Sequence, residues 1–137
     1  MARHKLGVLG TTGPEGTPQS ALVGIAVTPK LDIIFDTVKS SRKYPNLLAR
    51  PTCSFVIGLD GEQTVQYEGI ATELSGEELA HYQPFYFAAL PDGPLRLSWE
   101  GIVYFVVHPT WIRFSDFAQT PPLIVEFPHG HCAHQAQ

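Results

Sequence analysis

The sequence predicts a mainly β fold: an antiparallel split or closed β-barrel of six or seven strands with two short helices. Short apolar runs alternate with turn residues such as Gly, Pro and Asp through the first half of the chain. In the second half, the apolar segment Ile102–Pro109 is too long to leave both of its faces in water. Closing such strands into a barrel removes the exposed edges of an open sheet.

The individual elements follow from apolar patterning and turn residues. Turns are expected at residues 13–16, 29–30 and 60–61, because Gly, Pro and Asp-Gly favour turn dihedrals. The predicted strands are Leu6–Thr11, Ser20–Thr28, Leu31–Asp36, Thr52–Leu59, Gln63–Glu73, Ile102–Pro109 and Thr110–Asp116.

Two segments read as helices. The first begins at Ser41 and ends by Pro51, because the residue before a proline is pushed out of helical geometry. The second begins after Ser75, where Glu78 completes the pattern of a capping box, and Pro84 is expected to limit or kink it.

Length and composition indicate one globular domain, which we assign to residues 1–127. The chain has 137 residues, of which 44% are hydrophobic, enough for a proper core. Its formal net charge is −4 with nine Lys and Arg, which argues against nucleic-acid binding, since that requires clustered cations. No apolar run reaches membrane-spanning length, and Met1–Lys5 lacks the apolar stretch of a secretory signal, so we expect a cytoplasmic protein that binds no membrane.

The two cysteines do not form a disulfide framework, and they fit a reducing compartment. Cys132 belongs to a cluster of potential soft-metal ligands near the end of the chain, together with His129, His131 and His134. This segment is terminal and rich in Gly and Pro, and no second ligand pair occurs at a usual spacing. We therefore expect residues 128–137 to be a disordered tail and predict no metal site.

The most informative stretch runs from Phe35 to Leu47, where an apolar strand leads into hydroxyls, two adjacent cations and a helix. Ser40 or Ser41 can cap that helix, and Arg42 and Lys43 add a guanidinium and an ammonium at the same end. The arrangement is typical of phosphate binding. A capped surface helix with cations in water has the same pattern.

The flanks of this stretch resemble the pyridoxamine 5′-phosphate oxidase-like flavoproteins, the FMN-binding split barrels. The similar segments follow the order of that family over roughly residues 7 to 73, about half the chain. They are the turn and strand Gly16–Val23, the strand Leu31–Thr37, the phosphate loop Ser41–Lys43, the helix Asn46–Pro51 and the strand Val65–Ala71. The resemblance implies a flavin site between two subunits of a homodimer.

The resemblance assigns binding-site residues to this chain by their positions within these segments. The resemblance implies that Arg42 and Lys43 contact the FMN phosphate with Ser41 beside them, and that Asp36 and Thr37 stand at the end of the strand. Thr64, or its neighbour Gln63 after a shift of one residue, matches a flavin-contacting glutamine. The strand resembling the wall for the flavin ring supplies Ala21, Leu22 and Val23.

Two departures from the family pattern narrow the expected activity. Asp36 replaces an aromatic residue, and its carboxylate disfavours a nearby phosphate unless it points away or pairs with a cation. Ala21 and Ala26 occupy positions where pyridoxamine 5′-phosphate oxidases carry charged residues, the second of which binds the substrate. We expect a protein that binds flavin but oxidises pyridoxamine phosphate poorly.

Side-chain catalytic motifs are lacking: there is no Gly-x-Ser-x-Gly, His-Glu-x-x-His or Cys-x-x-Cys sequence. His81 is expected at the surface or an interface, Glu68 in solvent, and His108 stays unassigned. This suits a flavoprotein, because the cofactor then carries the redox chemistry. The sequence thus predicts an FMN-dependent oxidoreductase with a small-molecule substrate. The alternatives are a deazaflavin-dependent reductase, for which Lys43–Leu47 resembles a binding stretch, and a non-catalytic flavin- or haem-binding barrel.

Overall fold

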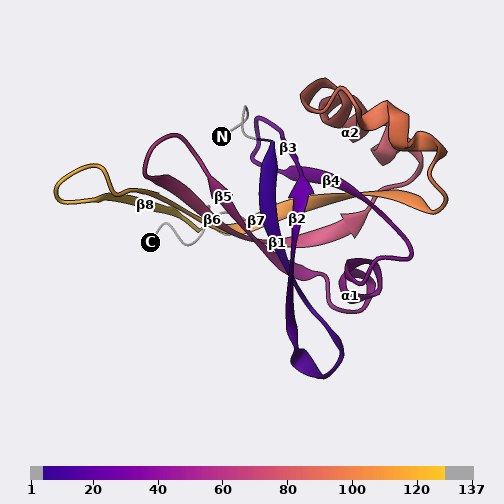
Figure 1. The fold of residues 1–137 in the computed structure, drawn as a ribbon, viewed down its shortest axis with the longest axis horizontal. Helices are drawn as coiled ribbons and strands as arrows, with labels where there is room; N and C mark the ends of the chain where they lie inside the picture. Colours follow the sequence, from indigo (N-terminus) through magenta and orange to yellow (C-terminus); the bar gives the residue numbers. More distant parts are fainter. Residues whose placement is uncertain (1–4, 129–137) are drawn as a thin grey trace.

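The computed structural model describes residues 5–128, and these form one antiparallel sheet rolled into a half-barrel (Figure 1). The sheet has eight strands in the order β2-β1-β5-β6-β7-β4-β3, with β8 paired to β7. The strands are β1 Leu6–Thr12, β2 Pro18–Gly24, β3 Ala26–Val27, β4 Ile33–Val38, β5 Thr52–Gly58, β6 Gln63–Glu73, β7 Ile102–Asp116 and β8 Leu123–Phe127. The helices are α1 Lys43–Ala49 and α2 Gly76–Ala89, with 3₁₀ turns η1 Pro14–Gly16 and η2 Gly93–Ser98. The predicted mainly β fold is confirmed.

The strands differ from the prediction in three ways: Ser20–Thr28 is divided into β2 and β3, the last two predicted strands merge, and β8 is added. Ile102–Pro109 and Thr110–Asp116 form the single 15-residue strand β7. Its pairing with β6 shifts register at Glu68/Gly69, where a bulge accommodates Pro109, which cannot donate to the ladder. Gly69 is required there, because a Cβ would lie 2.5 Å from the His108 carbonyl oxygen. The additional strand β8 follows two prolines, which hid it in the sequence pattern.

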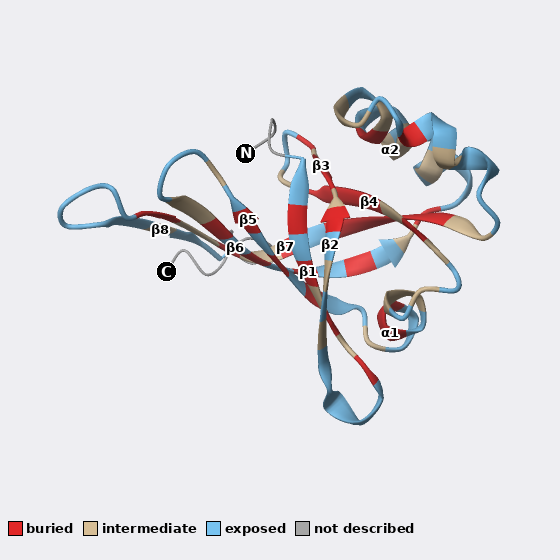
Figure 2. Ribbon diagram, viewed as in Figure 1, coloured by how far each residue is buried: buried red, intermediate tan, exposed pale blue. Residues whose placement is uncertain are grey.

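Strand β4 and the first part of β7, residues 102–107, are covered on both faces, and Figure 2 shows buried residues along β4. Alternate residues of a strand face opposite sides, so Phe35 and Phe105 stack inside the half-barrel, with ring centroids 5.4 Å apart. Ile34 and Tyr104 face outward into a second core beneath α2. Helix α2 therefore covers the outward side chains of the first part of β7 within one chain.

The two helices cover opposite faces of this double-sided sheet. Helix α1 packs Leu47 into the inner core, whereas α2 packs Tyr86 into the outer one. Helix α2 starts where predicted, but the Ser75 side chain makes no capping hydrogen bond, and the helix runs five residues beyond Pro84. Within the described range, no helix is long and apolar enough to cross a membrane.

The turn between β3 and β4 is held in an unusual conformation by Tyr67. Leu31 has φ of 68°, a left-handed geometry that is strained for a branched residue. The Tyr67 hydroxyl shares its proton between the carbonyl oxygens of Leu31 at 2.7 Å and Val107 at 3.1 Å. Tyr67 is buried, so this hydroxyl fixes the turn, and with it Asp32, to the centre of the sheet.

Replacing Tyr67 by Phe is expected to lower the free energy of unfolding by about 1–3 kcal/mol, because two carbonyls lose a buried donor. The matched control is Tyr104→Phe, since the buried Tyr104 hydroxyl has no hydrogen-bond partner within residues 5–128. That variant is expected to be neutral or stabilising in urea denaturation. Equal losses for the two variants would contradict the assigned role of the Tyr67 hydroxyl.

Candidate functional site

Two hollows flank the start of α1 and meet at Lys43. The first, of about 190 Å³, lies between α1 and the strands β1 and β2. The second, of about 400 Å³, lies between β2, β4 and the segment that leads from η2 into β7. Eight of the ten predicted site residues line them: Ala21, Arg42 and Lys43 the first, and Leu22, Val23, Asp36, Thr37 and Ser41 the second, which Lys43 also borders.

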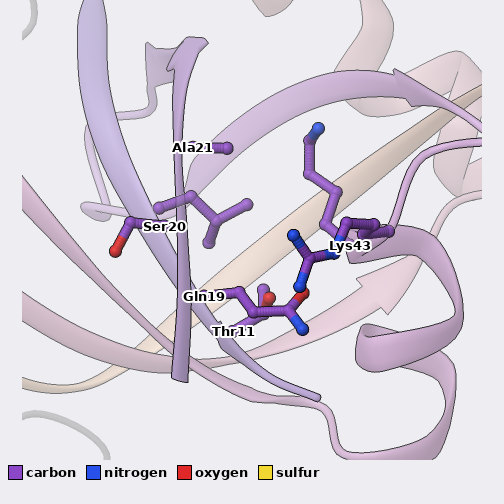
Figure 3. A pocket seen from close by; sticks show the side chains of 7 residues that line it. Thr11, Gln19, Ser20, Ala21 and Lys43 are labelled. Carbon is purple, nitrogen blue, oxygen red and sulfur yellow. The ribbon is translucent and has the colours of Figure 1, made fainter. Parts of the chain in front are cut away.

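Lys43 is a partly buried cation without a partner. Among the partly buried Lys and Arg of residues 5–128, Arg50, Arg96 and Arg113 each hydrogen-bond or pair with an oxygen, whereas Lys43 makes neither contact. Burial lowers the pKa of Lys43, and the charge of Asp36 opposes this only partly. In Figure 3 the Lys43 side chain stands across a gap from Ala21 on β2. The geometry leaves an ammonium at a hollow with no hydrogen bond or ion pair within residues 5–128.

Asp36, which departs from the family pattern, is neutralised. Along β4 it faces the side of Ile34, where α2 lies, and its Oδ2 accepts a 2.8 Å hydrogen bond from Arg96 Nε. Arg96 also donates to the Tyr86 hydroxyl at 3.1 Å and to Asp92 at 3.1 Å. Hydrogen bonding to Asp36 raises the pKa of Arg96 above its ordinary value. A phosphate near Lys43 therefore meets a paired carboxylate, not a bare one.

The loop before α1 differs from the predicted cap. The helix starts at Lys43, the cap position is Arg42, and no side chain caps it, so the predicted capping by Ser40 or Ser41 is wrong. The Ser41 hydroxyl instead lies 2.9 Å from the Thr37 hydroxyl, joining the loop to the end of β4. Pro45 removes one N–H from the first turn. The anion-binding capacity of this corner thus comes mainly from side chains.

Asn46 anchors α1 to the strands that form the far wall of the first hollow. Its buried amide donates to Thr11 Oγ1 at 3.1 Å and to Gln19 Oε1 at 2.9 Å. Thr11 and Gln19 line that hollow with Ser20, whose hydroxyl points to the opposite side of β2 from Ala21 (Figure 3). Sequence reasoning missed these residues, although the Asn-Leu pair of the helix was the available signal.

Trp99 is a second residue that the sequence did not indicate. It lines the larger hollow, is about half exposed, and its ring lies 5.9 Å from the Arg96 guanidinium carbon. Trp99 follows η2 and is more than 50 residues from Lys43 in the sequence, so no local motif could place the two at the same site.

Gln63 and Thr64 are not brought to these hollows within one chain. Both lie at the start of β6, where Thr64 pairs with Gly58 and Ser115, and the Gln63 amide reaches Asp116 Oδ2 at 3.4 Å. Neither residue lines either hollow. Their assignment to flavin binding stays a prediction. The His/Cys cluster at residues 129–134 lies outside the described residues.

Replacing Lys43 by Met is expected to stabilise the ligand-free protein. A lysine pKa that is lower in the folded than in the unfolded state means that protonation favours unfolding. The penalty is complete at neutral pH, begins to fall as pH rises through the folded-state pKa, and disappears above the higher unfolded-state pKa. Urea denaturation at pH 7 should give a higher midpoint for Lys43→Met, with no change for the exposed control Lys39→Met. A lower midpoint for Lys43→Met would mean that its charge stabilises the fold.

Comparisons with known proteins agree with this fold. A sequence model of the pyridoxamine 5′-phosphate oxidase family matches residues 1–115, whereas comparison with curated proteins gave no match. The fold is similar to a heme binding protein from Mycobacterium smegmatis, with a TM-score of 0.79, 17% identity, and coverage of 93% of this chain and 54% of that one. The chain thus spans about half the length of that protein.

Two further solved structures are similar over most of both chains. A pyridoxamine 5′-phosphate oxidase-related, FMN binding protein from Nostoc punctiforme PCC 73102 has a TM-score of 0.67 and 13% identity, covering 90% of this chain and 85% of its own. An F420 reductase has a TM-score of 0.65 and 23% identity, covering 81% and 90%. At these identities the likeness concerns the fold. The match of the family model over most of the sequence shows that the chain belongs to the pyridoxamine 5′-phosphate oxidase family.

Proposed function

We propose that this protein is an FMN-dependent oxidoreductase that holds the cofactor phosphate at Ser41, Arg42 and Lys43. The observation that carries the proposal is the unpaired, partly buried ammonium of Lys43 at the junction of two hollows. Leaving a cation partly desolvated costs free energy, which a bound dianion would offset. Perturbed cations of this kind concentrate at functional sites.

The residues around Lys43 fit a phosphate. Arg42 is exposed beside it, lines the first hollow, and makes no ion pair within the described part of the chain, so its guanidinium is available as a two-pronged donor. The Ser41 hydroxyl is held at the same corner by Thr37. The one carboxylate lining the larger hollow, Asp36, is already paired with Arg96. Together these groups supply two cations and two hydroxyls.

The larger hollow fits a flat apolar ring. Its walls include the apolar side chains of Leu22, Val23, Ile102 and Trp99, and the two hollows together reach the size of about 300–1,000 Å³ usual for small-ligand sites. Bound FMN would exchange a hydride or electrons with a substrate at its ring. In this chain the apolar walls orient that ring and exclude water from one side of it. No side chain is assigned a catalytic role.

We further propose that the site is shared between two copies of the chain. Val8, Leu22 and Val56 are exposed apolar residues on adjacent strands, paired as Val8↔Leu22 and Val8↔Val56, and Leu6 extends the row. Leu22 also borders the larger hollow, so this apolar face reaches the proposed cofactor site. Interfaces of obligate dimers are apolar in this way. A second copy would then be the source of Gln63 and Thr64.

A deazaflavin is the second candidate cofactor, supported by the likeness to an F420 reductase. Haem is less well supported, because neither hollow is lined by a described His, Cys or Met that would ligate iron. The substrate is a small molecule other than pyridoxamine phosphate, because Ala21 and Ala26 carry no charge and Ala26 is buried in the outer core.

The visible spectrum of purified protein distinguishes the cofactors by a flavin, deazaflavin or Soret band. Reduction by NAD(P)H without oxygen then separates an enzyme from a binder.

Replacing Arg42 and Lys43 together by Ala is expected to weaken FMN binding on the order of 10²–10⁴-fold while leaving riboflavin affinity almost unchanged. Two charge-assisted contacts of about 1.5–3 kcal/mol each are removed, and only FMN carries the phosphate that makes them. Quenching of tryptophan fluorescence measures both affinities, because Trp99 lines the larger hollow. The control Lys5→Ala with Lys30→Ala removes the same charge from exposed positions. Equal losses for FMN and riboflavin would assign the pair to folding instead.

The shared site predicts a dimer. Light scattering at micromolar concentration should give twice the mass of one chain, and Val8→Ser with Val56→Ser should shift the mass towards the monomer with parallel loss of FMN affinity. A wild-type monomer that binds FMN tightly would remove the second copy from the site while leaving the phosphate contact in place.

A further inference from the structure

A third hollow, of about 280 Å³, lies between α2 and the turn that precedes β4. On one side α2 presents His81, Tyr82 and Phe85, whose rings touch: the His81 ring lies 4.8 Å from Tyr82 and 6.0 Å from Phe85. On the other side, the strained turn held by Tyr67 presents Asp32, with Lys30 also on the lining. The lining combines an aromatic wall with a carboxylate, and none of it belongs to the two hollows at Lys43.

Asp32 is a buried carboxylate with little compensation. Its side chain is 11% exposed, and it accepts a hydrogen bond from His108 Nδ1 to Oδ1 at 2.9 Å and a further one from the Tyr82 hydroxyl. An ionised carboxylate only accepts, so Nδ1 is the donor, and the carboxylate has about four acceptor positions to fill. The buried Asp116, by contrast, accepts from Ala118 N, Gln119 and Gln63. Asp32 has unused acceptor capacity beside a hollow.

Asp36, near the other end of β4, is a comparable carboxylate that has a cationic partner. There Asp36 also lies beneath α2, and the Arg96 guanidinium both pairs with it and stands 6.0 Å from the centre of the Tyr86 ring. Tyr82 lies one helical turn before Tyr86 and lines the hollow with Asp32. Asp36 thus has a carboxylate, a tyrosine ring and a guanidinium together, whereas Asp32 has the tyrosine ring and the His108 imidazole but no ion pair with a Lys or Arg within residues 5–128.

The field in the hollow is negative at Tyr82. Burial raises the pKa of Tyr82, and the charges of Asp32 and Glu78 raise it further. Lys30 is the opposing charge, but it is exposed and makes no ion pair with Asp32 in the described structure. A mostly apolar hollow with a desolvated carboxylate at its base favours a ligand with a cationic head and an apolar body.

We propose that this hollow binds a small organic cation, with an ammonium or amidine-type head against Asp32 and an apolar body against Tyr82, Phe85 and His81. The head takes the place that Arg96 holds at Asp36, and His108 positions the carboxylate by fixing Oδ1. The site is independent of the flavin, since no residue is shared with the hollows at Lys43.

The test compares benzylammonium with the neutral isostere benzyl alcohol by calorimetry on the full chain. Benzylammonium is expected to bind at least about tenfold more tightly, and Asp32→Asn should remove that preference while still accepting from His108. Glu78→Gln removes the same charge from an exposed position near Tyr82 and should change affinity by less than about threefold. Equal affinities for the two probes, or an unaffected Asp32→Asn protein, would overturn the proposal.

Variants at two exposed positions test the proposal even if the Asp32→Asn protein does not fold. Lys30→Ala removes a like charge and is expected to tighten benzylammonium binding, whereas Phe85→Ala removes part of the aromatic wall and is expected to weaken binding severalfold. Opposite signs for either variant would contradict the proposal. Replacing Arg42 and Lys43 by Ala should leave benzylammonium affinity unchanged, so failure of the flavin proposal and failure of this one are distinguishable.

Discussion

The structure depends on the burial of β4 and of the first part of β7, residues 102–107, on both faces. A half-barrel core fills one side and α2 covers the other, so a polar side chain in these segments has little access to water except at the ends of β4. Burying a polar or charged group is costly unless it is paired or hydrogen-bonded. The polar side chains of β4 and of the residue before it therefore have fixed partners: Asp36 pairs with Arg96, Thr37 with Ser41, and Asp32, just before β4, with His108.

This constraint explains the position of the proposed cofactor site. β4 leaves the double-sided core at Val38, and α1 begins at Lys43 and must return its Leu47 to the inner core. The connecting loop is fixed at its base by the two hydroxyls of Thr37 and Ser41, and α1 is fixed to β1 and β2 by Asn46. Lys43 is the first residue of α1 and lies between these anchors. They hold it in a partly buried position, where desolvation disfavours its charged form. The rigidity of the anchors makes this position suitable for gripping an anion.

Local patterning was sufficient to predict most of the fold from the sequence. Strand β6 coincides with its prediction at Gln63–Glu73, because the Asp60-Gly61 turn precedes it and the predicted helix start at Ser75 follows it. Long-range pairing was not visible: Pro109 reads as a strand end, yet a bulge opposite Gly69 carries β7 through it. Likewise, no spacing rule could reveal that Arg96 neutralises Asp36, because 60 residues separate the two and η2 brings them together. The predicted serine cap is wrong because the Ser41 hydroxyl hydrogen-bonds to the Thr37 hydroxyl at the end of β4 and not to the first turn of α1.

We propose that the Lys43 ammonium binds a phosphate dianion, and the titration of Lys43 tests this proposal most directly. NMR detection of a lysine ¹³Cε resonance, assigned through Lys43→Met, gives the Lys43 pKa with no ligand, with riboflavin and with FMN. The account predicts a pKa below the ordinary lysine value in the free protein and with riboflavin, and a rise when FMN is added, because the phosphate charge stabilises the ammonium. The same pKa in all three samples, or equal rises with riboflavin and FMN, would contradict it.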